Sequence, residues 1–438
     1  MLVCGTLIHA PEPGVIEIIE DALVTVDQTG NIVGIERGPA ASQQDDDVIR
    51  LTANQYLLPG LVDLHIHAPQ WPQMGKALHL PLNEWLQEYT FPLEAKYADL
   101  AFARVAYESL VDNLLANGTT TATYFGTVHL EATKLLADIA VDKGQRAVIG
   151  KVAMDNGAEC PDFYRDETTA SGLEETRAFI EYVSGLDNDL VLPAVTPRFI
   201  PSCTDEMLDG LGQIAGEYGC HVQTHCSESD WEHNYVIERH GINDTQSLDQ
   251  FGLLTEKTVL AHGNLVCDSD MDTIKGRSSG IAHCPLSNFY LSHAVFPVRK
   301  ALDRGLKLGL GTDIAGGASP SIFHNCQVAI TASRALEDGV DPGCPVHERG
   351  TPGSRIDYRE AFWMATTGGG KALGLDIGLF RPGYAFDAIV IDTTVADSNL
   401  LTWPELDTPD DILQKIIYNA DRRNIVRTWV QGRDVTLD

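Results

Sequence analysis

The sequence has no apolar run that approaches the roughly 20 residues a membrane-spanning helix needs. The first 14 residues contain no basic region followed by a long apolar stretch, so we expect no signal peptide. Positive charge is also scarce, because 31 Lys and Arg stand against 62 Asp and Glu, a formal net charge of −31. Nucleic acids and anionic membrane surfaces are bound through clustered cations, so neither is an expected partner. These absences favour a soluble, cytoplasmic protein.

Paired cysteines are missing as well. The nine cysteines are an odd number and include no C-x-x-C pair. A disulfide framework is therefore not expected in a chain of this length, and most cysteines should be small buried apolar residues. The sequence also has no Walker loop and no G-x-G-x-x-G after a strand, which excludes phosphate-loop and nicotinamide enzymes.

The two ends of the chain have a similar pattern that differs from the middle. Short β-branched segments fill residues 1–58 and return at 388–392 and 425–430, within residues 379–438. We expect both ends to pair as one small β domain around a central domain of residues 59–378. The acidic stretch 43–47 is expected to be a solvated loop.

The central part alternates short apolar runs with helical patterns, which is typical of repeated βα units and a parallel sheet. Eight strands are expected, at 61–67, 119–124, 147–154, 192–198, 222–225, 259–262, 280–283 and 308–313. They predict an α/β fold, a closed (β/α)₈ barrel of the TIM type. The long connection between the first two strands should lie on the catalytic face and shape a pocket.

Residues that can bind or act beside a metal ion stand at five of the eight strand ends, where the chemistry of such barrels gathers. His65 and His67 are two apart on one strand, so both imidazoles point the same way. The later strands end in His225, His262, His283 and Asp313. Imidazole and carboxylate ligands suit zinc, with iron as the rival. We therefore predict one metal ion per chain, which activates a water molecule for attack.

Other residues near these ends are candidates for proton transfer. Glu228 comes three residues after His225 and is the expected proton carrier, although a helix-start Glu is the alternative. Asp313 can accept a proton from the attacking water. His262 is expected to hydrogen-bond that water, with a packing role as the alternative. His283 stays open between an active-site donor and a structural hydrogen-bonder.

At Pro59–His67 the sequence resembles the opening motif of the metal-dependent amidohydrolase superfamily. No lysine stands where two-metal members have a bridging ligand, so the single-metal deaminase branch fits better. Further motifs resemble the guanine deaminase family within that branch, over nearly the whole chain. They are His67-Ala68-Pro69-Gln70, Thr196-Pro197-Arg198-Phe199, His225-Cys226-Ser227-Glu228 and Gly311-Thr312-Asp313-Ile314-Ala315-Gly316-Gly317.

The resemblance implies a site and a reaction. The implied zinc ligands are His65, His67, His225 and Asp313. The implied guanine contacts are Gln70, Arg198 and Phe199. From its place at a strand end, His262 is expected to contact the substrate as well. The implied reaction is hydrolytic deamination of guanine to xanthine and ammonia by a zinc-activated water, with Glu228 as proton shuttle, in a homodimer.

Elementary chemistry agrees with these contacts. The guanidinium fork of Arg198 matches the O6 and N7 acceptors of guanine, and Phe199 can lie against the purine face. An ion pair within an acidic protein is the alternative role of Arg198.

Two other functions stay open. The same barrel can deaminate another aminated heterocycle, such as an adenosine derivative, a pterin or a triazine. A non-catalytic scaffold is the remote alternative, which the complete ligand set disfavours. The unrelated zinc deaminases that use H-x-E with a later P-C-x-x-C are excluded, because no C-x-x-C is present.

Overall fold

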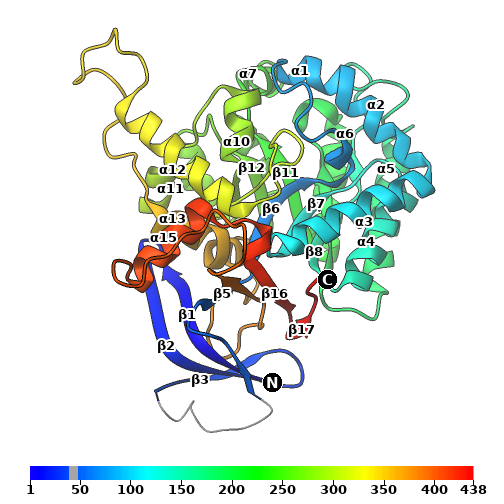
Figure 1. Cartoon of the computed structure of the whole chain (residues 1–438). Helices are drawn as coiled ribbons and strands as arrows, with labels where there is room; N and C mark the ends of the chain where they lie inside the picture. Colours follow the sequence, from blue (N-terminus) through cyan, green and yellow to red (C-terminus); the bar gives the residue numbers. More distant parts are fainter. Residues whose placement is uncertain (39–47, 438) are drawn as a thin grey trace.

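The computed structural model describes residues 1–38 and 48–437 and contains a barrel and a second sheet (Figure 1). The acidic stretch 43–47, predicted to be a loop, lies outside the described residues, as does Asp438. In the part of the chain that is described, no helix combines the length and the apolar character needed to cross a lipid bilayer. Five cysteines are buried free thiols, namely Cys160, Cys203, Cys226, Cys284 and Cys326.

The central sheet forms the predicted barrel. Its strands are β6 (Leu61–His67), β7 (Thr119–Phe125), β8 (Arg146–Gly150), β10 (Val191–Pro197), β11 (His221–Cys226), β12 (Thr258–His262), β13 (Gly280–His283) and β14 (Lys307–Leu310), with β9 (Val152–Ala153) beside β10. Neighbouring strands in this order are all parallel. The first and last approach one another where Asp313 N–H donates to the His65 carbonyl at 2.8 Å and His67 N–H to the Ile314 carbonyl at 2.9 Å. The α/β barrel prediction is confirmed.

Two strand predictions were wrong in detail. The segment predicted at 147–154 is interrupted at Lys151 and forms two strands. The strand predicted at 308–313 ends at Leu310, so Asp313 lies beyond it. The reason is a tertiary hydrogen bond: Thr312 donates its backbone N–H to the Asp63 carboxylate at 2.9 Å instead of continuing the strand ladder.

Helices cover the outside of the barrel (Figure 1). The longer ones are α3 (Leu100–Ala116), α4 (Leu130–Lys143), α5 (Thr169–Ser184), α6 (Asp205–Tyr218), α7 (Asp230–His240), α9 (Asp268–Gly276) and α12 (Ile322–Asp338). The shorter ones are α8 (Asp244–Gln250), α10 (Pro285–Ser287), η6 (Asn288–Ser292), α11 (Val298–Asp303), α13 (Tyr358–Trp363), η7 (Met364–Gly368) and α14 (Gly369–Leu373), with η5 (Ile200–Ser202) after β10.

Helix α6 illustrates why the sequence forms these elements. The hydroxyl of Thr204 accepts the Met207 N–H at 3.1 Å and caps the first turn, and Gly219 ends the helix with φ of 58°. The side chains it buries recur at helical spacing: Met207, Leu208, Leu211, Ile214 and Ala215. They pack with apolar residues of β11, β12 and β13 in one core cluster, which holds the strands that carry the site.

The connection between β6 and β7 is a chain of short helical turns. They are η2 (Ala68–Gln73), α1 (Leu82–Trp85), η3 (Leu86–Thr90), α2 (Phe91–Glu94) and η4 (Ala95–Ala98). Because this connection follows the carboxyl end of β6, it lies over the face where the strand-end residues meet.

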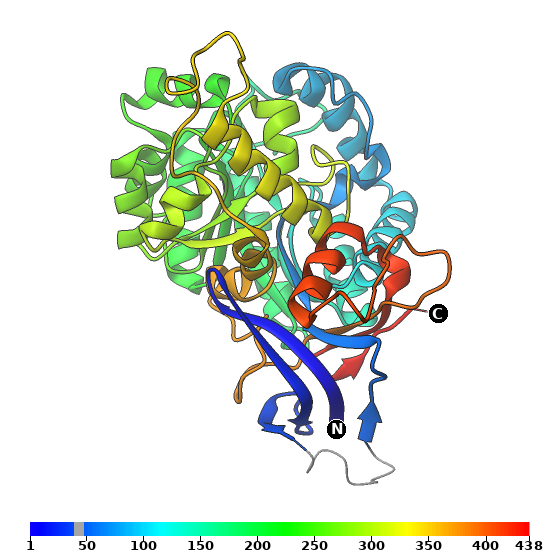
Figure 2. The same ribbon diagram turned by 60° about the vertical axis from the view of Figure 1, so that its left-hand side comes forward.

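Both chain ends contribute to the second sheet (Figures 1 and 2). Its strands are β1 (Leu2–Glu12), β2 (Val15–Val26), β3 (Ile32–Arg37), β4 (Val48–Arg50), β5 (Gln55–Pro59), β15 (Ala388–Asp392), β16 (Ile425–Val430) and β17 (Arg433–Asp434). The antiparallel pairing of β5 with β15 joins the two ends, as predicted. The helix α15 (Pro409–Asn419) and the turn η8 (Arg422–Asn424) lie between β15 and β16 and were not predicted. The domain boundaries after residues 58 and 378 stay a prediction.

A buried ion pair connects the barrel to this second sheet. Arg146 at the start of β8 donates to both carboxylate oxygens of Asp387, at 3.0 and 3.1 Å. Asp387 also accepts the backbone N–H of Gln431 at 2.7 Å. Both charged side chains are almost fully buried, so each needs the other.

We expect Asp387→Asn to lower the free energy of unfolding by about 3 kcal/mol, because it leaves the Arg146 charge buried without its counter-ion. Urea unfolding of the two proteins measures the difference. A loss well below about 1 kcal/mol, the range of an exposed ion pair, would contradict the interpretation.

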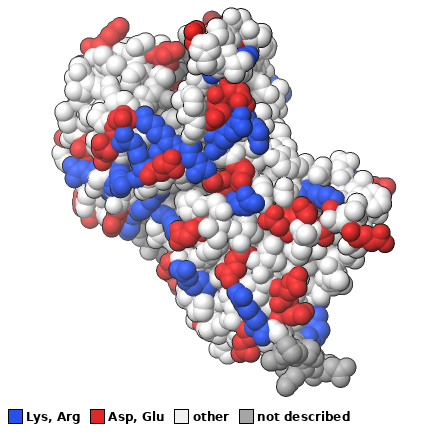
Figure 3. All heavy atoms as spheres, turned by 90° about the vertical axis from the view of Figure 1, so that its left-hand side faces the viewer, with Lys and Arg blue, Asp and Glu red and all other residues white. Residues whose placement is uncertain are grey.

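Charged side chains of both signs are interspersed on the face of the molecule shown in Figure 3. Around α9 and α11 several basic side chains are in ion pairs: Arg277 with Asp249, and Lys300 and Arg304 with Asp268. These three cations therefore have acidic partners within the chain.

Candidate metal centre and substrate pocket

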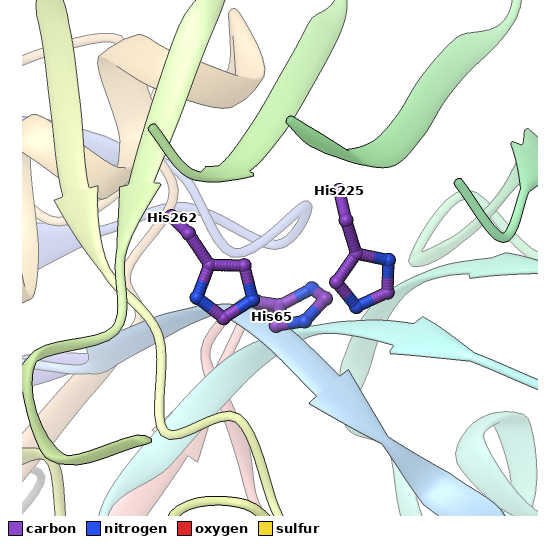
Figure 4. Close-up of side chains that lie close together, drawn as sticks. All are labelled: His65, His225 and His262. Atoms are coloured by element: carbon purple, nitrogen blue, oxygen red, sulfur yellow. The ribbon is translucent and has the colours of Figure 1, made fainter. Parts of the chain in front are cut away.

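Five buried side chains converge at the carboxyl ends of the barrel strands. His65 and His67 project from β6, His225 from β11 and His262 from the end of β12, while Asp313 follows β14. Figure 4 shows the imidazoles of His65, His225 and His262 facing one another. The parallel register brings together residues up to 248 positions apart, which is what the barrel geometry predicts.

The donor atoms are close enough to share one ion. His67 Nε2 lies 3.0 Å from His225 Nε2 and 3.6 Å from Asp313 Oδ1, and His65 Nε2 lies 3.2 Å from the same oxygen. Two overlapping groups, His65 with His67 and Asp313 and His65 with His225 and His262, have all their donor atoms within 4.8 Å of one another. The four predicted ligands are thus brought together, with His262 as a neighbour.

The donor set fits a metal ion. The Nε2 atoms of His65 and His262 are buried and have no hydrogen-bond partner among the described residues. Burial, followed by neighbouring positive groups, holds the pKa of His67 and of His225 well below the usual range. Burial alone would raise the pKa of Asp313, but the nearby imidazoles outweigh it and bring that pKa to about 2. Neutral imidazoles beside a carboxylate are the forms that bind zinc or iron.

Hydrogen bonds on the far side of the rings orient these imidazoles. Nδ1 of His225 donates to the backbone carbonyl of Arg198, which leaves Nε2 to face the centre. Nδ1 of His262 lies 2.9 Å from the Asn288 side-chain oxygen, and its Nε2 lies 3.8 Å from both Glu228 and Asp313.

Asp63 positions the segment that carries Asp313. Its carboxylate accepts the Thr312 hydroxyl at 2.6 Å and the backbone N–H groups of Thr312 and His65 at 2.9 and 3.2 Å. Burial raises the pKa of Asp63 to about 7 despite these hydrogen bonds. The residue belongs to the opening motif, but its bond to a segment 249 positions away could not be predicted from the sequence.

Glu228 follows β11 and lies inside the site rather than in helix α7, which begins at Asp230. Its backbone is held twice, because its N–H donates to Glu232 at 2.7 Å and its carbonyl accepts from Asn264 at 2.9 Å. Burial is the main cause that raises the pKa of Glu228, and Asp313 adds to it while His262 opposes it.

A pocket opens beside these residues. It is lined by His67, Gln70, Leu82, Trp85, Leu86, Arg198, Phe199, His225, Glu228, Leu291, Asp313 and Gly316. Three of the four predicted substrate contacts, Gln70, Arg198 and Phe199, are among them, and the fourth, His262, is not. The connection that was predicted to shape the pocket supplies its apolar wall from α1 and η3, whereas Leu291 of η6 was not predicted, because an isolated Leu in a connection carries no chemical pattern.

Arg198 makes an ion pair that the sequence did not reveal. Its guanidinium donates to both oxygens of Glu94, at 2.7 and 3.1 Å, and both side chains are buried. Gln70 also donates to Glu94, at 2.8 Å. Arg198 therefore forms the ion pair considered as its alternative role and also lines the pocket, while its contact with guanine stays a prediction.

The remaining predicted residues differ in their placement. Phe199 is 5% exposed, and its ring centroid lies 6.0 Å from that of His225. His283 is buried beside Phe296, and neither of its ring nitrogens has a hydrogen-bond partner in the described ranges. Burial lowers the pKa of His283 to about 3. His283 is outside the pocket wall, so the structure supports neither of its two predicted roles.

Comparison with known proteins gives a consistent result. The profile of the Amidohydrolase family matches residues 56–435. The guanine deaminase of Dictyostelium discoideum is 39% identical over 452 residues, which cover 98% of this chain and 97% of that protein. The guanine deaminase of Homo sapiens is 38% identical over 448 residues, covering 98% and 95%.

A solved structure of guanine deaminase from C. acetobutylicum, with guanine bound in its active site, aligns with a TM-score of 0.90 at 33% identity and covers 99% of both chains. The chain belongs to the amidohydrolase family and, within it, to the guanine deaminases.

Proposed function

We propose that this protein catalyses the hydrolytic deamination of guanine, in which guanine and water give xanthine and ammonia. The observation that carries the proposal is one pocket whose lining combines His67, His225 and Asp313 of the donor cluster with Gln70, Arg198 and Glu228. Metal donors, a proton carrier and donors for a purine edge are the parts such a reaction needs.

We assign the metal ligands as His65, His67, His225 and Asp313. Their donor chemistry supports zinc, although iron binds the same groups and metal analysis of the purified protein decides between them. When bound, the ion lowers the pKa of a water molecule toward neutrality, so that hydroxide is available for attack.

The pocket residues orient the purine. Arg198 keeps N–H donors beyond the two it gives to Glu94, and these suit the O6 and N7 acceptors of guanine. Gln70 supports the same edge, and Phe199 offers a ring for the purine face. This orientation turns C2 and its amino group toward the imidazole cluster.

Proton movement is assigned to three groups. Glu228 takes the proton of the attacking water and delivers it to a ring nitrogen of guanine, and its raised pKa favours holding that proton. His262 uses its unpartnered Nε2 to hydrogen-bond the water and to steady the tetrahedral carbon at C2. Asp313 accepts the second proton from the hydroxyl that is now bonded to C2 and passes it to the amino group, which leaves as ammonia.

Turnover of guanine to xanthine, followed by ultraviolet absorbance, tests the proposal. We expect xanthine to form, turnover to stop after removal of the metal with a chelator, and activity to return when zinc is added back. A panel that includes an adenosine derivative, a pterin and a triazine addresses the alternative substrates. Turnover of one of these by the metal-loaded protein, without turnover of guanine, would overturn the assignment.

The homodimeric state and the cytoplasmic location stay predictions.

A further inference from the structure

Glu94 is a fully buried carboxylate that lies behind the pocket wall. It ends helix α2 and is 0% exposed, and it is not among the residues that line the pocket. It accepts hydrogen bonds from two side chains that do line the pocket, Arg198 and Gln70. Anything that Glu94 contributes to substrate binding must therefore pass through these two residues.

Helix α2 holds Arg198 on two sides. The Glu94 carboxylate takes one N–H from each terminal nitrogen, at 2.7 and 3.1 Å, which fixes the guanidinium plane. The ring of Phe91, three residues earlier on α2, lies 5.0 Å from the guanidinium carbon. Two of the five N–H donors are used, so the directions of the remaining donors are fixed by α2.

Hydrogen bonds also fix the orientation of the Gln70 side-chain amide. Its amide nitrogen donates to Glu94 at 2.8 Å, and its amide oxygen accepts the backbone N–H of Ala315 at 3.1 Å. A carboxylate can only accept and a backbone N–H can only donate, so the two ends of the amide cannot be exchanged. The Gln70 amide has one further N–H donor and one further acceptor position on its oxygen, and the directions of both are fixed.

Hydrogen-bond donors with a fixed direction discriminate between ligands, whereas donors that can rotate do not. A guanidinium free to rotate can turn away from a ligand that lacks an acceptor, so the missing hydrogen bond costs little. A guanidinium held by Glu94 is left with an unpaired buried N–H beside such a ligand. We propose that Glu94 is a positioning residue that determines specificity: by fixing Arg198 and Gln70 it makes the pocket select purines with an oxygen at C6. The proposal rests on the proposed function.

The test compares two purines that share the 2-amino group and differ in the C6 oxygen. The KM of guanine and the Ki of 2-aminopurine against guanine turnover are measured for the wild-type protein and for Glu94→Gln. In this variant an amide NH₂ replaces one accepting oxygen and faces the donors of Arg198 or Gln70. We expect the KM of guanine to rise roughly tenfold or more, with a smaller change in kcat, and the Ki of 2-aminopurine to change by less than about threefold.

Two controls separate positioning from a general loss of structure. Asp387→Asn removes another buried carboxylate that binds an arginine through both oxygens, at the junction with the second sheet, and should leave the ratio of Ki to KM unchanged. In an Arg198→Met background, adding Glu94→Gln should change that ratio much less than it does in the wild-type protein, because only the contribution through Gln70 then remains. Metal content is measured in each variant, since a change in occupancy affects both ligands alike.

An unchanged ratio in Glu94→Gln would overturn the proposal, even if the variant were less stable. If Glu94→Gln does not fold, Glu94→Asp keeps the charge and is one methylene shorter, so it should lose part of the selectivity. A wild-type ratio in that variant would equally overturn the proposal. Failure of the proposed function is a different result, because the wild-type protein would then not convert guanine at all.

Discussion

Glu228→Gln is expected to lower kcat for guanine by roughly 100- to 10,000-fold while the metal content stays that of the wild-type protein. The substitution keeps the size of the side chain but removes the group that takes and returns a proton. Glu228 is not one of the side chains in the two metal-donor groups, which is why metal should be retained. Steady-state kinetics and metal analysis on the same preparation measure the two quantities.

The matched control is Glu232→Gln, the same chemical change four residues later. Glu232 is also buried, but its carboxylate accepts the backbone N–H of Glu228, and an amide oxygen can still do so. We expect this variant to retain activity within about tenfold, because no proton leaves or enters through it. Activity near the wild-type level in Glu228→Gln would remove Glu228 from the mechanism, and loss of the metal would make it a structural support instead.

The sequence sufficed for those parts of the site that depend on strand geometry. His65 and His67 share a face because strand side chains alternate, and the ends of parallel strands meet at one face of a barrel. These rules predicted the meeting of His225 and Asp313 with the first strand, although Asp313 lies beyond the strand predicted to carry it. Its position depends on the hydrogen bonds from Thr312 to Asp63, and periodicity does not reveal such tertiary bonds.

Contacts between a residue in a connection and a distant strand end could not be predicted from the sequence. Glu94 lies in a chain of short turns with no regular hydrophobic period, and it meets Arg198 from a distance of 104 residues. Nothing in the sequence indicates that Glu94, one of 62 acidic residues, is buried. The ambiguity over Arg198 had the same origin, since an ion pair and a substrate contact have one sequence pattern. Only the folded position of α2 shows that the side chain in the ion pair also lines the pocket.

Removal of one imidazole from the cluster should have the other large effect. We expect His225→Ala to lose most of its bound metal and to reduce guanine turnover to near the uncatalysed level. His225 Nε2 lies 3.0 Å from His67 Nε2 and belongs to a donor group with His65. With one donor missing, the remaining groups hold the ion less tightly, and the activated water is lost with it. The thermal midpoint of the variant should no longer rise on addition of zinc, because stabilisation by a ligand requires a binding site in the folded state.

His221→Ala is the control on the same strand. His221 lies at the opposite end of β11, where its ring bonds the Leu373 carbonyl at 2.9 Å. The amino-terminal face of such a barrel serves stability rather than catalysis, so this variant should be less stable and yet keep its metal and its activity. Equal metal loss in both variants would show that disturbance of β11, and not removal of a ligand, causes the loss of metal. Full metal content in His225→Ala would mean that the ion is held by the other group of donors, His65 with His67 and Asp313, and the assignment of His225 as a ligand would be wrong.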